Sequence, residues 1–245
     1  MTSGTDHRAS RAREDAFEDA ADPELARVAL SRLAGRPHPA DRPHPADLLH
    51  DPVVEEHAIL LLGFSVAAAD FFLAHPEELT SLADVSPRTA ERLAGEVGEA
   101  VAALGPGDGL RRFRRRAAYR LAARDLGGAD VEGVMAELSA IAEACLRAAV
   151  AHAAPSSGLA VLGMGKLGGG ELNYSSDVDV IFVHPGVGPD AATRAATEAA
   201  AVTTLLSAPG VEGIALRVDA GLRPEGRAGP LSRSLESTVE YYRRH

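Results

Sequence analysis

One stretch decides the fold of this chain, GMGKLGGGELNYSSDVDVIF at residues 163–182. The apolar run before it, residues 159–162, is typical of a buried strand, and the glycines that follow predict a tight turn. A second strand begins through Asp-x-Asp, and strand alternation puts Asp177 and Asp179 on the same face. Two carboxylates beside a glycine turn with free backbone N–H groups are a typical arrangement for Mg²⁺ and a nucleotide phosphate chain.

The same stretch holds the only lysine of the chain, Lys166, and the only asparagine, Asn173. The chain has no glutamine and otherwise uses arginine where a basic side chain is needed. Chance is one interpretation of these two single residues. The other, which we favour, is a chemical need for these side chains at this place.

A third strand is expected over residues 213–219, ending in Asp219. If the strands are neighbours, Asp219 shares a face with Asp177 and Asp179. Three carboxylates from two strands suit a site for two Mg²⁺ ions. The glycines would let the backbone close around phosphate oxygens, and two side chains could add contacts. The expected phosphate contacts in this region are Gly163, Gly165, Lys166, Gly168, Gly169 and Ser176.

Each part of this pattern is common alone, because glycine turns are frequent and Asp-x-Asp usually lies in a solvated loop. The order of strand, glycine turn, Asp-x-Asp strand and later aspartate is more specific. It is not a Walker loop, since the chain has no Gly-x-x-x-x-Gly-Lys-Ser/Thr. It is not a dinucleotide fingerprint, because only a short segment separates the glycines from the acidic pair.

Composition narrows the classes of protein. The net charge of −10 argues against nucleic acid as a partner. The single cysteine, Cys145, excludes an internal disulfide and fits the cytoplasm. The N-terminus lacks the apolar run of a secretory signal. The most apolar stretch, residues 58–74, is short for a membrane span and contains Asp70, so no membrane association is expected.

The chain is expected to divide into three parts. Residues 1–50 are predicted as a disordered segment or linker, with disorder over 1–22. Residues 51–155 are predicted as a helical region, and 156–245 as a domain of strands and helices that is cut off at its C-terminus. One long helix is expected from residue 51 to residue 75. Further helices are expected at 110–124, 131–151 and 191–206.

The helix at 110–124 carries seven arginines and no acidic residue. Its one apolar stripe is Phe113, Ala117 and Leu121. The arginines indicate either a solvated face or an anionic partner: a phosphate, the acidic surface of a protein substrate, or acidic groups elsewhere in the chain. Cys145 lies in the apolar stripe of the next helix, which favours a structural thiol over a nucleophile.

Residues 163–182 resemble the signature of the glutamine synthetase adenylyltransferase family, also called adenylyl-removing enzymes. Asp219 with LRPEGRAGPL at 222–231 resembles the second block of that family. FRRR at 113–116 with AARDL at 122–126 resembles the helical segment before its first catalytic domain. The resemblance covers roughly residues 50–245.

The resemblance implies an α+β chain, with a helical region before a nucleotidyltransferase core of the DNA polymerase β type and its small mixed sheet. Family members carry two such cores. This chain is similar to the N-terminal half, which removes AMP from an adenylylated tyrosine of glutamine synthetase with phosphate and releases ADP. The other half attaches AMP from ATP. The implied partners are glutamine synthetase, ATP, ADP, phosphate and a PII-type signalling protein.

By motif match, Asp177, Asp179 and Asp219 carry over as catalytic ligands of Mg²⁺. The glycine turn with Lys166, and Arg223 of the second block, carry over as nucleotide or phosphate contacts. The chain departs from the family at Gly221, where many members have an arginine. Two alternatives stay open: adenylylation in the forward direction by this same domain, and an inactive module that only binds glutamine synthetase or a nitrogen-signalling protein.

Overall fold

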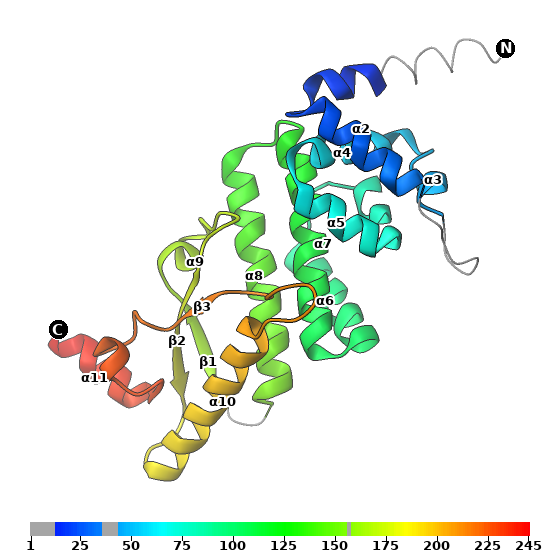
Figure 1. Ribbon diagram of the computed structural model, residues 1–245. Coiled ribbons are helices and arrows are strands. Elements are labelled where there is room, and N and C mark those ends of the chain that lie inside the picture. Colours follow the sequence, from blue (N-terminus) through cyan, green and yellow to red (C-terminus); the bar gives the residue numbers. More distant parts are fainter. Residues whose placement is uncertain (1–12, 36–43, 156–157) are drawn as a thin grey trace. The chain divides into compact units, whose positions relative to one another are not determined.

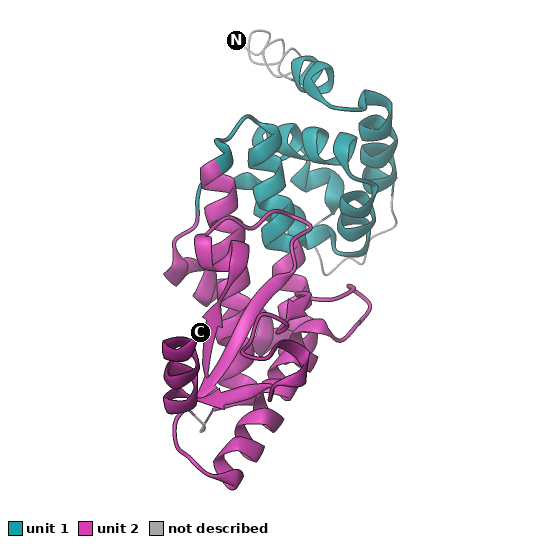
Figure 2. Cartoon of the chain, turned by 90° about the vertical axis from the view of Figure 1, so that its left-hand side faces the viewer, with its two compact units in different colours: residues 1–87, 116–131 teal, residues 88–115, 132–245 magenta. Residues whose placement is uncertain are grey.

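The computed structural model describes residues 13–35, 44–155 and 158–245 (Figure 1). The chain forms two compact units (Figure 2). Unit 1 comprises residues 1–87 and 116–131, and unit 2 comprises residues 88–115 and 132–245. The boundaries of these two units differ from those of the three parts expected from the sequence. The division into those three parts stays a prediction. Within the described ranges, no helix is both long and apolar enough to cross a membrane.

Unit 1 is built from helices around one apolar core. Its elements are a helix at residues 13–19, α2 (Pro23–Ala34), α3 (Pro45–Leu48), α4 (Pro52–Phe64), α5 (Val66–Ala74), the 3₁₀ helix η1 (Pro76–Ala83), and residues 116–126 of α7 (Pro106–Leu126). Fully buried side chains from four of these elements include Leu33, Ile59, Leu62, Phe72, Leu79 and Leu82. Each contributes roughly 1.5–3 kcal/mol by leaving water.

The single helix expected from residue 51 to residue 75 is interrupted at Ser65. Asp51 caps the start of α4, where its carboxylate accepts a hydrogen bond from the N–H of Val53 at 2.9 Å. Ser65 has extended backbone angles, and its hydroxyl accepts from the N–H of Ala68 at 3.2 Å, which begins α5. A serine that caps a new helix competes with continuation of the old one.

The prediction of disorder over residues 1–22 is wrong for residues 13–22. Residues 13–19 are helical, and Ala16, Phe17 and Ala20 are buried. The guanidinium of Arg27 lies 4.5 Å from the centre of the Phe17 ring. The polar composition of this segment hides its buried apolar residues, two within the helix and Ala20 just after it, and their burial docks the segment. Residues 1–12 lie outside the described residues.

Unit 2 combines helices with a four-stranded mixed sheet. Its helices are α6 (Ala90–Leu104), residues 106–115 of α7, α8 (Val131–Ala153, from its second residue), α9 (Gly165–Gly169), α10 (Pro189–Ser207), the 3₁₀ helix η2 (Gly226–Ala228) and α11 (Leu235–Arg244). The expected α+β class is therefore confirmed.

The central strand is β2 (Val178–His184), which pairs with all three other strands. β1 (Ala160–Gly163) pairs with it antiparallel along one edge. On the other edge, β3 (Val218–Asp219) runs parallel to its first two residues and β4 (Ser232–Ser234) runs parallel to its last three. Six of its seven residues are buried, so β2 forms the middle of the unit.

The third strand is shorter than the expected 213–219. Only Val218 and Asp219 pair as a strand. Ala215 and Leu216 are both buried, and their N–H groups both donate to the carbonyl of Leu206 at 3.0 Å. This part of the chain therefore packs on the end of α10 instead of extending the sheet.

Candidate functional site

The glycine turn after β1 is seated directly on Asp179. The N–H of Met164 donates to the Asp179 carbonyl at 2.9 Å, which ties the turn to β2. Gly165 has φ +51°, and a Cβ at this position would lie 2.7 Å from Asp179 Oδ2. Both the backbone angle and this close approach require glycine. The turn thus brings exposed backbone to Asp179, a predicted metal ligand.

The rest of the turn is compact and open to solvent. A Cβ on Gly168 would lie 2.7 Å from the Gly163 carbonyl oxygen, so residue 168 has to be glycine. Leu167 is buried and anchors α9. Gly170, with φ +70°, ends α9 in the left-handed conformation. The expected phosphate contacts in this turn are all exposed: Gly163, Gly165, Lys166, Gly168 and Gly169.

The loop that leads to β2 is fixed by side-chain hydrogen bonds. Asn173 Oδ1 accepts from the N–H of Ser175 at 3.0 Å and from the hydroxyl of Ser176 at 2.9 Å. Asn173 therefore shapes the turn, as asparagine often does. Farther back, the N–H of Leu172 donates to the buried Ser139 hydroxyl of α8 at 3.2 Å. Sequence reasoning missed Ser139, because a serine within an apolar helical stripe gives no signal of its partner.

Asp179 and Asp219 lie opposite each other in the parallel register of β2 and β3. Both are half-buried. Asp219 Oδ1 accepts a hydrogen bond from the N–H of Gly221 at 2.7 Å. The structure therefore places two of the three predicted carboxylates on adjacent strands, and the glycine turn contacts one of them, Asp179. Carboxylate oxygens are the ligands that Mg²⁺ prefers, so the donor type and the register of this pair fit that ion.

Asp177 is held differently. It lies immediately before β2, and its Oδ1 accepts a hydrogen bond from Arg217 Nε. Arg217 Nη2 also donates to the Ser175 carbonyl at 2.8 Å. Among the described residues, no group of three His, Cys, Asp or Glu side chains is placed to hold a metal ion.

Arg223 organises its own loop. Its guanidinium donates to the carbonyls of Ala220 at 2.7 Å, Gly229 at 3.2 Å and Arg227 at 3.3 Å. These bonds hold the segment between β3 and β4 together. Its role as a phosphate contact stays a prediction.

The arginine-rich helix α7 binds groups of the protein itself. In unit 2, Arg111 donates to the Ala208 carbonyl at 2.9 Å and to Asp108 Oδ1 at 2.9 Å. Arg112 pairs with Glu212 at 3.1 Å, and both side chains are largely buried. These contacts fasten the segment after α10 to α7. They match the interpretation that the arginines serve acidic groups elsewhere in the chain.

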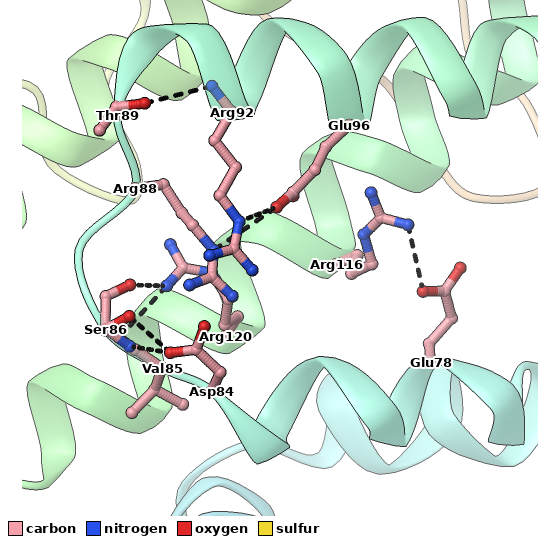
Figure 3. Close-up of polar contacts among 10 residues, drawn as sticks. All are labelled: Glu78, Asp84, Val85, Ser86, Arg88, Thr89, Arg92, Glu96, Arg116 and Arg120. Atoms are coloured by element: carbon pink, nitrogen blue, oxygen red, sulfur yellow. Dashed lines mark hydrogen bonds and ion pairs between the residues drawn. The ribbon is translucent and has the colours of Figure 1, made fainter.

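In unit 1, arginines in residues 116–126 of α7 also bind groups of the protein itself (Figure 3). Arg120 is buried and donates to the carbonyls of Ser86 at 2.8 Å and Val85 at 3.2 Å. Arg116 lies 3.7 Å from the carboxylate of Glu78. The alternative that the arginines of α7 form only a solvated face is wrong for Arg116 and Arg120. Their guanidinium groups contact carbonyl and carboxylate oxygens of the protein.

Cys145 is fully buried in α8, and burial raises the pKa of its thiol to about 12. The reactive form of cysteine is the thiolate. Cys145 is therefore a structural residue, in agreement with the sequence.

Comparison with known proteins identifies the family. Residues 56–245 match the family described as glutamate-ammonia ligase adenylyltransferase. The chain is 41% identical over 244 residues to a bifunctional glutamine synthetase adenylyltransferase/adenylyl-removing enzyme of Streptomyces avermitilis. It is 42% identical over 247 residues to the protein of that name in Streptomyces coelicolor. Each match covers 94% of this chain but only 24% and 25% of the respective relatives.

The match begins within α4 and includes the glycine turn and the three aspartates. This chain belongs to the glutamate-ammonia ligase adenylyltransferase family.

Proposed function

We propose that unit 2 carries a Mg²⁺-dependent nucleotidyltransferase site of the DNA polymerase β type. The placement of Asp179 and Asp219 on adjacent strands, beneath a glycine turn with exposed backbone, carries this proposal. The relatives' names indicate glutamine synthetase as the protein substrate. The reaction we assign is the removal of AMP from a tyrosine of adenylylated glutamine synthetase by phosphate, in the cytoplasm.

In this reaction a phosphate oxygen forms a bond to the phosphorus of the tyrosyl-AMP. The bond to the tyrosine oxygen breaks, and the products are ADP and the free tyrosine. The exposed glycine backbone and Lys166 bind phosphate oxygens, and Ser176 borders them. Asp177, Asp179 and Asp219 would hold Mg²⁺, which would offset negative charge on the phosphates. For Asp177 to take part, its bond with Arg217 has to open.

The test is the double variant Asp177→Asn/Asp179→Asn. It keeps the size of both side chains and removes the two charges, so we expect loss of ADP formation from labelled phosphate and adenylylated glutamine synthetase. The matched control is Asp190→Asn, which removes an exposed carboxylate at the start of α10. Full activity of the double variant would refute the assignment. Incubation with ATP and unmodified glutamine synthetase tests transfer in the forward direction.

A binding module without activity is the second candidate. The bond between Arg217 and Asp177 favours it, because this bond occupies an oxygen of one of the three predicted ligands. Such a module would recognise glutamine synthetase or a PII-type protein. Calorimetry with Mg²⁺ and ADP separates the two candidates: heat of binding supports the enzyme, and its absence supports the module.

A further inference from the structure

Arg217 lies in the sheet next to the aspartates predicted to bind metal. The N–H of Val178 donates to the Arg217 carbonyl at 2.8 Å, which sets the register just before β2 and β3 pair. Asp177 and Arg217 therefore occupy one row across the strands, and Asp179 and Asp219 occupy a row two residues farther on. Because side chains alternate along a strand, both rows project on the same face. Arg217 thus shares a row with Asp177 and lies one row from Asp179 and Asp219.

The bond that Arg217 makes to Asp177 is accessible and weak enough to exchange. The Arg217 side chain is 62% exposed and that of Asp177 is 47% exposed. Ion pairs this open to water contribute little to stability, because water and salt screen them. A second bond, from Nη2 to the Ser175 carbonyl, orients the guanidinium toward the carboxylate. A ligand with a higher charge can therefore displace it.

We propose that Arg217 is an exchangeable counter-ion that competes with a divalent cation for Asp177 and, once displaced, binds phosphate. This inference rests on the metal site proposed above. A guanidinium on Asp177 occupies one acceptor oxygen and repels a second cation. After exchange, Arg217 stays one row from Asp179, on which the glycine turn is seated. Guanidinium groups match phosphate oxygens in geometry and charge. Loading of the cation thereby prepares the phosphate site.

The test measures two affinities with opposite expected changes. Binding of Mn²⁺ to the 245-residue chain is followed by electron paramagnetic resonance, and binding of ADP at saturating Mn²⁺ by calorimetry. In Arg217→Gln, Mn²⁺ should bind about two- to fivefold more tightly, the range for loss of an exposed ion pair. ADP should bind about tenfold more weakly, as expected for a lost charged hydrogen bond. Arg217→Lys keeps the charge, so its Mn²⁺ affinity should stay near that of the wild type.

The matched control is Arg244→Gln. This variant also removes one exposed arginine from an ion pair, with Glu240, in α11. That helix follows β4, which pairs with the far end of β2. We expect both affinities to stay at wild-type values. Circular dichroism confirms that each variant is folded.

Three results would overturn the proposal. The first is unchanged or weaker Mn²⁺ binding in Arg217→Gln. The second is an equal gain in Arg244→Gln, which would show a general charge effect. The third is unchanged ADP binding, which would remove the phosphate role. Absence of Mn²⁺ binding in the wild type and in every variant would instead refute the metal site itself, so the two failures are distinguishable.

Discussion

The contact between the glycine turn and Asp179 can be tested with two alanine variants. Gly165 and Gly170 both have positive φ, +51° and +70°. Alanine in the left-handed region costs about 1–2 kcal/mol, and this cost applies at both positions. A Cβ at Gly165 would also lie 2.7 Å from Asp179 Oδ2, whereas at Gly170 nothing lies within 4 Å. Gly165→Ala therefore has to move the carboxylate or the turn, which adds about 1–3 kcal/mol.

Urea unfolding measures the two free energies. Gly170→Ala should lose about 1–2 kcal/mol and Gly165→Ala about 2–5 kcal/mol, the sums of the costs just given. Mn²⁺ affinity should fall in Gly165→Ala only, because only that variant displaces Asp179. Equal losses of stability with equal Mn²⁺ affinities would refute the reasoning, since they would show that the turn is not seated on the carboxylate.

Three more predictions follow from buried polar groups. Ser139→Ala should cost about 1–3 kcal/mol in urea unfolding, because it leaves the buried Leu172 N–H without an acceptor; no loss would contradict the hydrogen bond. Burial lowers the pKa of His184 below its ordinary value of 6.5, so the unfolded chain takes up a proton more readily than the folded chain. Stability should therefore fall as the pH drops below 6.5 and level off below the folded pKa, and His184→Gln should lose this component of the pH dependence. Cys145 has a pKa of about 12, so a thiol-specific disulfide reagent at pH 8 should label it only after unfolding; rapid labelling of the folded chain would show that it is accessible.

Local patterns predicted much of the fold. The helices α7, α8 and α10 and the strands β1 and β2 fall where hydrophobic periodicity, glycine and proline indicate them, within a few residues. The strand β4 could not be found this way. Its sequence, Ser-Arg-Ser, has no apolar alternation, and only its pairing with the end of β2 makes it a strand. The break at Ser65 was missed because apolar residues continue on both sides of it.

For the candidate site, local patterns indicated where the aspartates lie along the strands, but not which side chains contact one another. Alternation and spacing are local properties, so they identified the aspartates before β2, within β2 and at the end of β3. The bond from Arg217 to Asp177 joins residues forty positions apart, and no local pattern specifies it. The contacts of Arg223 were missed as well: the resemblance implied a phosphate contact, but its guanidinium donates to three carbonyls of its own loop.

The pairing of β2 by two separate strands has a consequence for how such proteins diversify. From Asp179 to Phe182 the central strand advances three residues, about 10 Å, while the partner chain uses thirteen, from Asp219 to Ser232. The residues between these two pairings, 220–231, form a loop that leaves the edge of β2 after β3 and returns to the same edge at β4. The register of each strand is set by its own pairing with β2. A relative with a longer or shorter loop would therefore keep Asp219 opposite Asp179, although its second block, residues 222–231 here, would change.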